Sequence, residues 1–340
     1  MRSHKLVVQA FVLATVILSI GGCHVELGDW SRAHFERTVE LQHAMADGST
    51  LTVGTASGSI DIEGQAVDEV RVVATIRGQA PTEEEARELA EATEIRFETT
   101  GGRLAIKADT PKTSGGRSVS ISYDIVVPRQ TSVECGSASG SIKAVNLQGD
   151  VKASTASGSV ACEAIRGGSV HMSTASGSVR LSDGSELGSC ELRSSSGRVS
   201  AEQVQAERIR ISSASGSVEL RDARTQEIDM RATSGGVNGR DIDCSRLTAE
   251  SASGHATVEF SPSAPADVTA DVSSISGGVT VVAPSGFAGR VEMSTTSGSV
   301  HCDLPVTVQG RISTKHISGS VGQGTGSLTL RATSGSVHVR

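Results

Sequence analysis

Two histidines occupy the same position of a repeated phrase, and imidazoles in register are candidate metal ligands. His301 and His338 each follow the glycine of a Ser-Gly pair by three residues, the glycines being Gly298 and Gly335. If the repeats stack in chain order, the two imidazoles lie two repeats apart, or roughly 10 Å at the usual strand spacing. One ion cannot bridge that distance without other ligands. We therefore expect no metal site and interpret both side chains as solvated surface histidines.

Paired carboxylates would indicate a polysaccharide lyase or hydrolase, since both kinds of enzyme use parallel β-helices. The acidic residues expected to face outward are scattered along the chain: Asp61, Glu63, Glu163, Glu219, Glu259 and Asp303. Aromatic platforms for sugar rings are scarce, because aromatic residues make up 2% of the sequence. We expect no catalytic residues, no cofactor and no enzymatic activity. A polysaccharide-acting enzyme is the lesser alternative.

Hydroxyl side chains recur three residues before the glycine of the phrase, at Thr155, Thr174, Ser194, Ser213 and Thr295. An exposed row of hydroxyls could bind ice or a repetitive polymer. This position, however, belongs to the set of alternate positions whose side chains should face the interior. We predict that most of these hydroxyls are buried and hydrogen-bonded within the protein. A dedicated ligand-binding array is the alternative.

All of these residues belong to one repeat, in which a small residue and Ser-Gly are followed, two positions after the glycine, mostly by Val or Ile. A short period of this kind, about 19 residues here, indicates one structural unit stacked on itself. The glycines are Gly58, Gly140, Gly158, Gly177, Gly197, Gly216, Gly235, Gly254, Gly277, Gly298, Gly319 and Gly335.

The positions around each glycine alternate between apolar and polar residues. Counted from the glycine, positions −7, −5, +2 and +4 are mostly apolar, and the positions between them are mostly polar. Each repeat thus predicts two short strands joined at a corner, where glycine tolerates positive φ and permits close approach between layers. We expect an all-β protein, a parallel β-solenoid of about 11–12 rungs. The rule for parallel crossovers favours a right-handed coil.

The cysteines fit this alignment. Cys135, Cys162, Cys190 and Cys302 occupy inward positions, so we interpret them as small core residues. Cys162 and Cys302 lie seven rungs apart in chain order, beyond the reach of a disulfide. Disulfides among the five cysteines after Cys23 are otherwise left open.

Residues 37–134, before the continuous repeats, hold the first rung and an α+β cap. Alternating strands flank a helix that a Thr82/Glu85 capping box opens and that continues to about Thr93. The solenoid follows at 135–340 and ends at His338-Val339-Arg340, directly after a strand. We expect an exposed last rung that permits self-association unless Arg340 blunts it.

Residues 1–22 have a basic start, an apolar stretch and small residues before Cys23, which resembles a bacterial lipoprotein signal. The resemblance implies a membrane anchor through lipid on Cys23, a linker over 23–36 and, with His24 in place of an Asp retention signal, the outer membrane. An ordinary secretory peptide is the alternative. The net charge of −7 and the absence of basic runs in the sequence argue against a nucleic-acid partner.

This layout, with a Val-Pro at Val127-Pro128 before many Ser-Gly-Ser-Val rungs, resembles a bacterial family named "putative adhesin", a domain of unknown function with β-strand repeats. The resemblance covers residues 37–340 and brings no catalytic residues. It implies a non-enzymatic lipoprotein of the cell envelope that presents a surface for adhesion to a polymer, surface or protein partner. A self-assembling structural solenoid of the envelope is the alternative.

Overall fold

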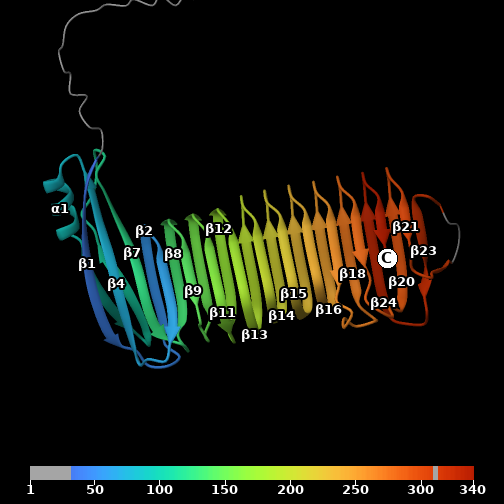
Figure 1. Cartoon of the computed structure of the whole chain (residues 1–340), viewed down its shortest axis with the longest axis horizontal. Helices are drawn as coiled ribbons and strands as arrows, with labels where there is room; N and C mark the ends of the chain where they lie inside the picture. Colours follow the sequence, from blue (N-terminus) through green and yellow to red (C-terminus); the bar gives the residue numbers. More distant parts are fainter. Residues whose placement is uncertain (1–31, 309–312) are drawn as a thin grey trace, which may run out of the picture. The chain divides into compact units, whose positions relative to one another are not determined.

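The repeats fold as rungs of two strands that meet at a Ser-Gly corner, as the computed structural model shows (Figure 1). In the rung at Gly158, β10 (Val151–Ser157) leads into the corner and β11 (Val160–Arg166) leaves it. Both strands pair in parallel and in register with the equivalent strands of the rungs on either side. The alternation buries Val151 and Val160 in a core shared by all rungs. The prediction of a parallel β-solenoid is confirmed.

The structure describes residues 32–308 and 313–340, of which Ala33–Arg340 form one compact unit. The signal peptide expected at 1–22 and the lipid attachment expected at Cys23 lie outside these residues. Within the described ranges, no helix is both long enough and apolar enough to span a membrane.

In the middle of the stack, the second strand of one rung continues into the first strand of the next. The strands of this part are β12 (Ser169–Ser176), β13 (Val179–Ser194), β14 (Val199–Ser213), β15 (Val218–Ala232), β16 (Val237–Ser251) and β17 (Ala256–Phe260).

Each of six successive rungs has a second bend, six residues after its glycine, which the alternation of apolar and polar residues does not predict. The residues at these bends adopt left-handed φ values between 47° and 60°: Asn146, Ala164, Asp183, Gln203, Asp222 and Asp241. Asn and Asp tolerate this conformation better than most residues, so four of the six carried a signal in the sequence.

The rung at Gly335 lies inside the stack. Its strands β24 (Gly326–Ala332) and β25 (Val337–Val339) pair on one side with β18 (Thr269–Ser274) and β19 (Val279–Val282). On the other side they pair with β20 (Gly289–Thr295) and β21 (Val300–Cys302), the rung at Gly298. The expectation of an exposed last rung is therefore wrong, and self-association through it loses its basis.

Two antiparallel strands cover the end of the stack beyond the rung at Gly298. They are β22 (Thr307–Val308) and β23 (His316–Val321), and β23 pairs with β20. Gly319 lies in the middle of β23, opposite Val291 of β20. The prediction that Gly319 is a repeat corner is wrong, because this segment runs back along β20 instead of adding a rung. The other eleven glycines of the phrase lie between the two strands of a rung.

The first rung consists of β2 (Thr50–Ser57) and β3 (Ile60–Gln65), which pair with β8 (Ser132–Ser139) and β9 (Ile142–Val145). The strand before β2 and the segment between β3 and β8 form the cap at this end of the stack (Figure 1). Its elements are β1 (Ala33–Ala44), β4 (Glu69–Ala80), α1 (Glu83–Glu91), β5 (Glu94–Thr100), β6 (Arg103–Asp109) and β7 (Ser118–Pro128). Helix α1 begins after Thr82, whose Oγ accepts a hydrogen bond of 3.3 Å from the Glu85 amide as predicted.

Candidate functional site

The corner glycines are required by the spacing between rungs. A Cβ on Gly140 would overlap the carbonyl oxygen of Gly58, and the same overlap recurs at each later corner against the glycine of the neighbouring rung. Of the eleven corner glycines described, Gly58 and Gly177 alone have φ in the positive range, at 125° and 154°. Close approach is therefore the main reason for glycine here, and positive φ is secondary.

The hydroxyls three residues before each glycine form a buried ladder. Seven of them donate to the carbonyl oxygen of a corner glycine on the neighbouring rung, at 2.7–3.0 Å. The seven donors are Thr155, Thr174, Ser194, Ser213, Ser251, Ser274 and Thr295. All seven are buried, which confirms the prediction for the five hydroxyls named in the sequence analysis and extends it to Ser251 and Ser274. The ladder holds the stack together and presents no hydroxyls to a ligand.

A different set of small residues is exposed. We define the corner face as the side chains at positions −2, −1 and +1 of each corner. Position −1 is serine in all eleven rungs, and ten of these serines are exposed: Ser139, Ser157, Ser176, Ser196, Ser215, Ser234, Ser253, Ser276, Ser297 and Ser334. Because neighbouring strands lie about 4.8 Å apart, the corner face repeats hydroxyl groups at that interval.

The cap turns one end of the corner face into a groove of about 880 Å³. Its floor consists of exposed alanines at position −2 of four successive rungs, Ala56, Ala138, Ala156 and Ala175. One wall comes from β6 and β7 and includes Ile106, Lys107, Val119 and Ile121. The groove therefore combines apolar side chains, hydroxyls and one exposed lysine.

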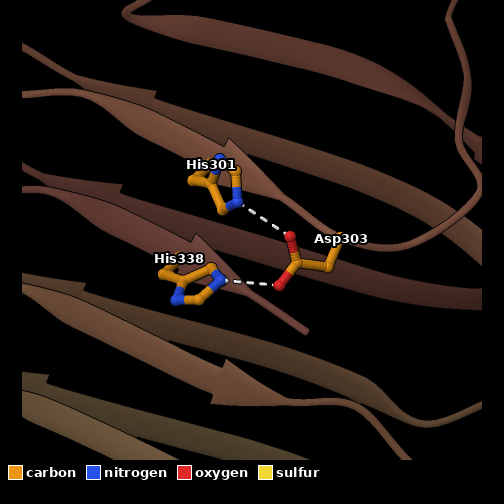
Figure 2. Close-up of side chains that lie close together, drawn as sticks. All are labelled: His301, Asp303 and His338. Carbon is orange, nitrogen blue, oxygen red and sulfur yellow. Dashed lines mark hydrogen bonds and ion pairs between the residues drawn. The ribbon is translucent and has the colours of Figure 1, made fainter.

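At the other end of the stack, His301 and His338 lie side by side. β21 and β25 are neighbours with His301 opposite His338, and the ring centroids are 5.0 Å apart. Both Nε2 atoms point at Asp303, at 2.8 Å from Oδ1 and 2.9 Å from Oδ2 respectively (Figure 2). The hydrogen bond from His338 lowers the pKa of Asp303, and His301 adds to the effect.

The expected separation of the two histidines is therefore wrong. A separation of two rungs holds only if the rungs stack in chain order, and the rung at Gly335 instead adjoins the rung at Gly298. Asp303 was treated as one of several scattered carboxylates. The cluster could have been found only with knowledge of the rung order.

A second group of charged residues lies at the junction of cap and solenoid. Asp61 of β3 lies between Asp124 of β7 and Lys143 of β9, and together they line a pocket of about 650 Å³ with Glu63 and Arg71. Partial burial raises the pKa of Asp61, and the charge of Asp124 raises it further against the opposing effect of Lys143. The expectation that these carboxylates form no cluster missed Asp124. The other outward carboxylates, Glu163, Glu219 and Glu259, lie on separate rungs.

The sequence profile described as Toastrack DUF4097 matches residues 168–340, just over half of the chain. The chain belongs to the Toastrack DUF4097 family. No curated protein matches the sequence.

Several solved structures align with this DUF4097 chain over most of their length. A putative adhesin from Parabacteroides distasonis is 12% identical, covers 89% of this chain and 97% of its own, and gives a TM-score of 0.42. A putative lipid binding protein from the same species is 12% identical, with 89% and 96% covered and a TM-score of 0.39. A putative adhesin from Bacteroides fragilis is 11% identical, with 89% and 97% covered and a TM-score of 0.35. At this identity, residue roles do not carry over between chains.

The five cysteines in the described part of this DUF4097 chain are free. Four are buried among apolar neighbours, namely Cys135, Cys162, Cys190 and Cys244. Burial raises the pKa of the Cys162 thiol to about 12, which keeps it protonated and unreactive. Cys302, at the outer rung, is half-buried. The interpretation of these inward cysteines as core residues is confirmed for Cys135, Cys162 and Cys190, and Cys302 is only partly covered.

Proposed function

We propose that this DUF4097 protein is a non-enzymatic binding protein of the bacterial cell envelope. Its corner face would contact a repeating polymer, a surface or a partner protein. The observation that carries this proposal is the exposed serine at position −1 of ten rungs. A ligand that itself repeats can use many such weak contacts at once, and many linked contacts give high avidity.

The groove supports the proposal because it supplies a place for specificity. Its alanine floor lets a ligand approach the backbone of four rungs, while Lys107 and the apolar wall distinguish one ligand from another. Concave, mostly apolar surfaces with a few polar groups are the usual form of ligand sites.

Anchoring belongs to the same proposal. Residues 1–22 and Cys23 support a lipid anchor, and His24 favours the outer membrane where a cell has two. Metabolic labelling with an alkyne fatty acid should mark the intact protein and fail to mark Cys23→Ser. Labelling of both proteins alike would refute attachment at Cys23.

The binding surface is tested with two matched substitutions in one column of the corner face. Ala156→Arg places a long side chain in the groove, whereas Ala252→Arg changes the equivalent position five rungs along the stack, away from the groove. Cells that display the Ala156→Arg protein should adhere to envelope polymers and matrices less than cells with Ala252→Arg. Equal adhesion by both variants and by deletion cells would refute the proposal.

Catalysis is tested at Asp61 and Asp124, where the structure brings two carboxylates together. We expect no cleavage products when the protein is incubated with a panel of glycans. Cleavage that is lost in Asp61→Asn would overturn the non-enzymatic assignment and place an active site in this pocket.

A further inference from the structure

We propose that His301, Asp303 and His338 form a binding site for one divalent transition-metal ion of the Zn²⁺ class. Each residue offers one ligand atom, and the three atoms lie within 4.8 Å of one another. Both imidazoles direct Nε2 at the same carboxylate (Figure 2). Two imidazoles and a carboxylate are a common set of protein ligands for Zn²⁺.

The solenoid itself positions these ligands. His301 and His338 are in register on β21 and β25, so their side chains leave the same face of adjacent strands. Asp303 follows His301 by two residues and therefore faces the same side. Its backbone N–H donates a hydrogen bond of 2.9 Å to the Val339 carbonyl, which fixes it beside the strand that carries His338.

The distances suit a tetrahedral ion after small side-chain rotations. Bonds of about 2.0–2.2 Å to nitrogen and oxygen place tetrahedral ligand atoms roughly 3.4 Å apart. The two measured Nε2–Oδ distances, 2.8 and 2.9 Å, are shorter by about half an ångström. Side-chain exposures of 72% for His301, 48% for Asp303 and 37% for His338 leave room for that adjustment. The fourth position would face solvent.

Imidazole ligands also decide the kind of metal. Mg²⁺ and Ca²⁺ prefer oxygen ligands, whereas imidazole suits Zn²⁺, Cu²⁺ and Ni²⁺. Because the site joins the rung at Gly298 to the rung at Gly335, the ion would link the outermost rung to its neighbour. An ion that binds the folded stack and not the unfolded chain stabilises the stack.

The neighbouring rung supplies a conservative substitution. Thr280 of β19 occupies the position equivalent to His338 on the next rung. Thr at this position is therefore compatible with the fold, and His338→Thr removes a ligand without disturbing strand pairing. The matched control is His171→Ala, since His171 has one carboxylate neighbour, Glu191, at 3.0 Å on the adjacent rung and lies outside the cluster.

The experiment is titration of the purified, untagged chain with ZnCl₂ by calorimetry and with CoCl₂ by visible absorption. The wild type and His171→Ala should share one site of the same affinity and show the spectrum of tetrahedral Co²⁺. His338→Thr and Asp303→Asn should bind at least about 100-fold more weakly, a loss beyond that of an outer-shell partner. MgCl₂ should not compete.

Two outcomes would overturn the assignment. One is no tight Zn²⁺ site in the wild type. The other is an unchanged affinity in both His338→Thr and Asp303→Asn while circular dichroism shows each folded, which would place the metal elsewhere. Neither outcome bears on adhesion through the corner face, because the ligands lie outside it.

Discussion

At each corner glycine the backbone of one rung touches the backbone of the next, and a side chain would have to occupy that contact. The hydroxyl three residues before a corner glycine donates to the carbonyl of the corner glycine on the neighbouring rung, so the repeat encodes both a close contact and a hydrogen bond between rungs. The ladder has two gaps, at Ala232 and Ala332, where the carbonyls of Gly216 and Gly277 face an alanine in place of a hydroxyl.

Substitution of a corner glycine tests the contact. Gly140→Ala should lower the free energy of unfolding by about 1–3 kcal/mol, the cost of overpacking against atoms that cannot move away. Gly136→Ala, four residues earlier, should be nearly neutral because nothing lies within 4 Å of its Cβ. Urea unfolding followed by circular dichroism measures both. Equal losses would show that glycine matters here for another reason.

The ladder can be tested in both directions. Ser213→Ala should lower the free energy of unfolding by about 1 kcal/mol, the net value of a buried hydrogen bond, since the Gly197 carbonyl loses its 2.8 Å donor. Ala232→Ser should raise it by a similar amount by filling the gap at Gly216. Thermal unfolding of both variants is the measurement. If Ala232→Ser lowers the stability, neighbouring atoms already fill the space that the added hydroxyl would occupy.

Asp61 gives a prediction about pH. Its pKa is raised in the folded protein, so the folded state holds this proton more tightly than the unfolded chain. The contribution of Asp61 to stability is therefore present below its unfolded pKa and is lost as the pH rises through the folded value. Asp61→Asn should stabilise the protein at pH 7 and change little at pH 3. A variant that is less stable than wild type at pH 7 would contradict this sign.

At the scale of elements, the sequence predicts the position of each strand well, but it predicts less well which strands pair with each other. Alternation around each glycine gives β10 and β11 directly, because burial of one strand face is a local property. Two features depend on more than local pattern. The bend at position +6 recurs at Ala164 and Gln203, residue types that give no signal for a left-handed conformation, so the Asn and Asp at the other bends do not form a regular pattern. The path of β23 back along β20 breaks the repeat without any loss of the Ser-Gly phrase at Gly319.

Paired cysteines test the rung order. In the structure Asp271 of β18 is in register with Thr329 of β24, whereas stacking in chain order would place it beside Glu292 of β20. In a Cys302→Ser background, Asp271→Cys with Thr329→Cys should form a disulfide on mild oxidation, because adjacent strands bring Cα atoms within the usual range of about 4.4–6.8 Å. Asp271→Cys with Glu292→Cys should not.

Peptide mapping by mass spectrometry distinguishes the two arrangements. A disulfide in the Glu292 pair and none in the Thr329 pair would establish stacking in chain order, and it would also separate His301 from His338.

At the scale of the whole molecule, one core runs through all rungs, and each rung contacts mainly its neighbours. Such stacks lose stability where a neighbour is removed. The position of a repeat in the stack, and therefore the candidate metal site, could not be predicted from the sequence, because every rung offers nearly the same edge to every other. The repeats are similar to one another, and this similarity makes the fold predictable. The same similarity makes the order of the rungs unpredictable.

Deletion of residues 323–340 tests whether a rung loses stability when its neighbour is removed. Removal of β24 and β25 takes out an internal rung and leaves β20 and β21 without their parallel partners. We expect limited proteolysis to cut the deleted protein within 283–322 while residues 33–282 stay protected. Protection of 283–322 in the deleted protein would show that the rung at Gly298 can dock directly on the rung at Gly277.

The inserted rung also sets an order of events in the making of the protein. β20 and β21 are synthesised before β24 and β25, yet they cannot reach their final places until the later strands have entered between them and β18 and β19. A chain interrupted before residue 326 would thus expose unpaired strand edges on both sides of the missing rung, and such edges invite aggregation and proteolysis. The arrangement makes synthesis of residues 326–339 a condition for closing the stack, so a copy that lacks them keeps open strand edges.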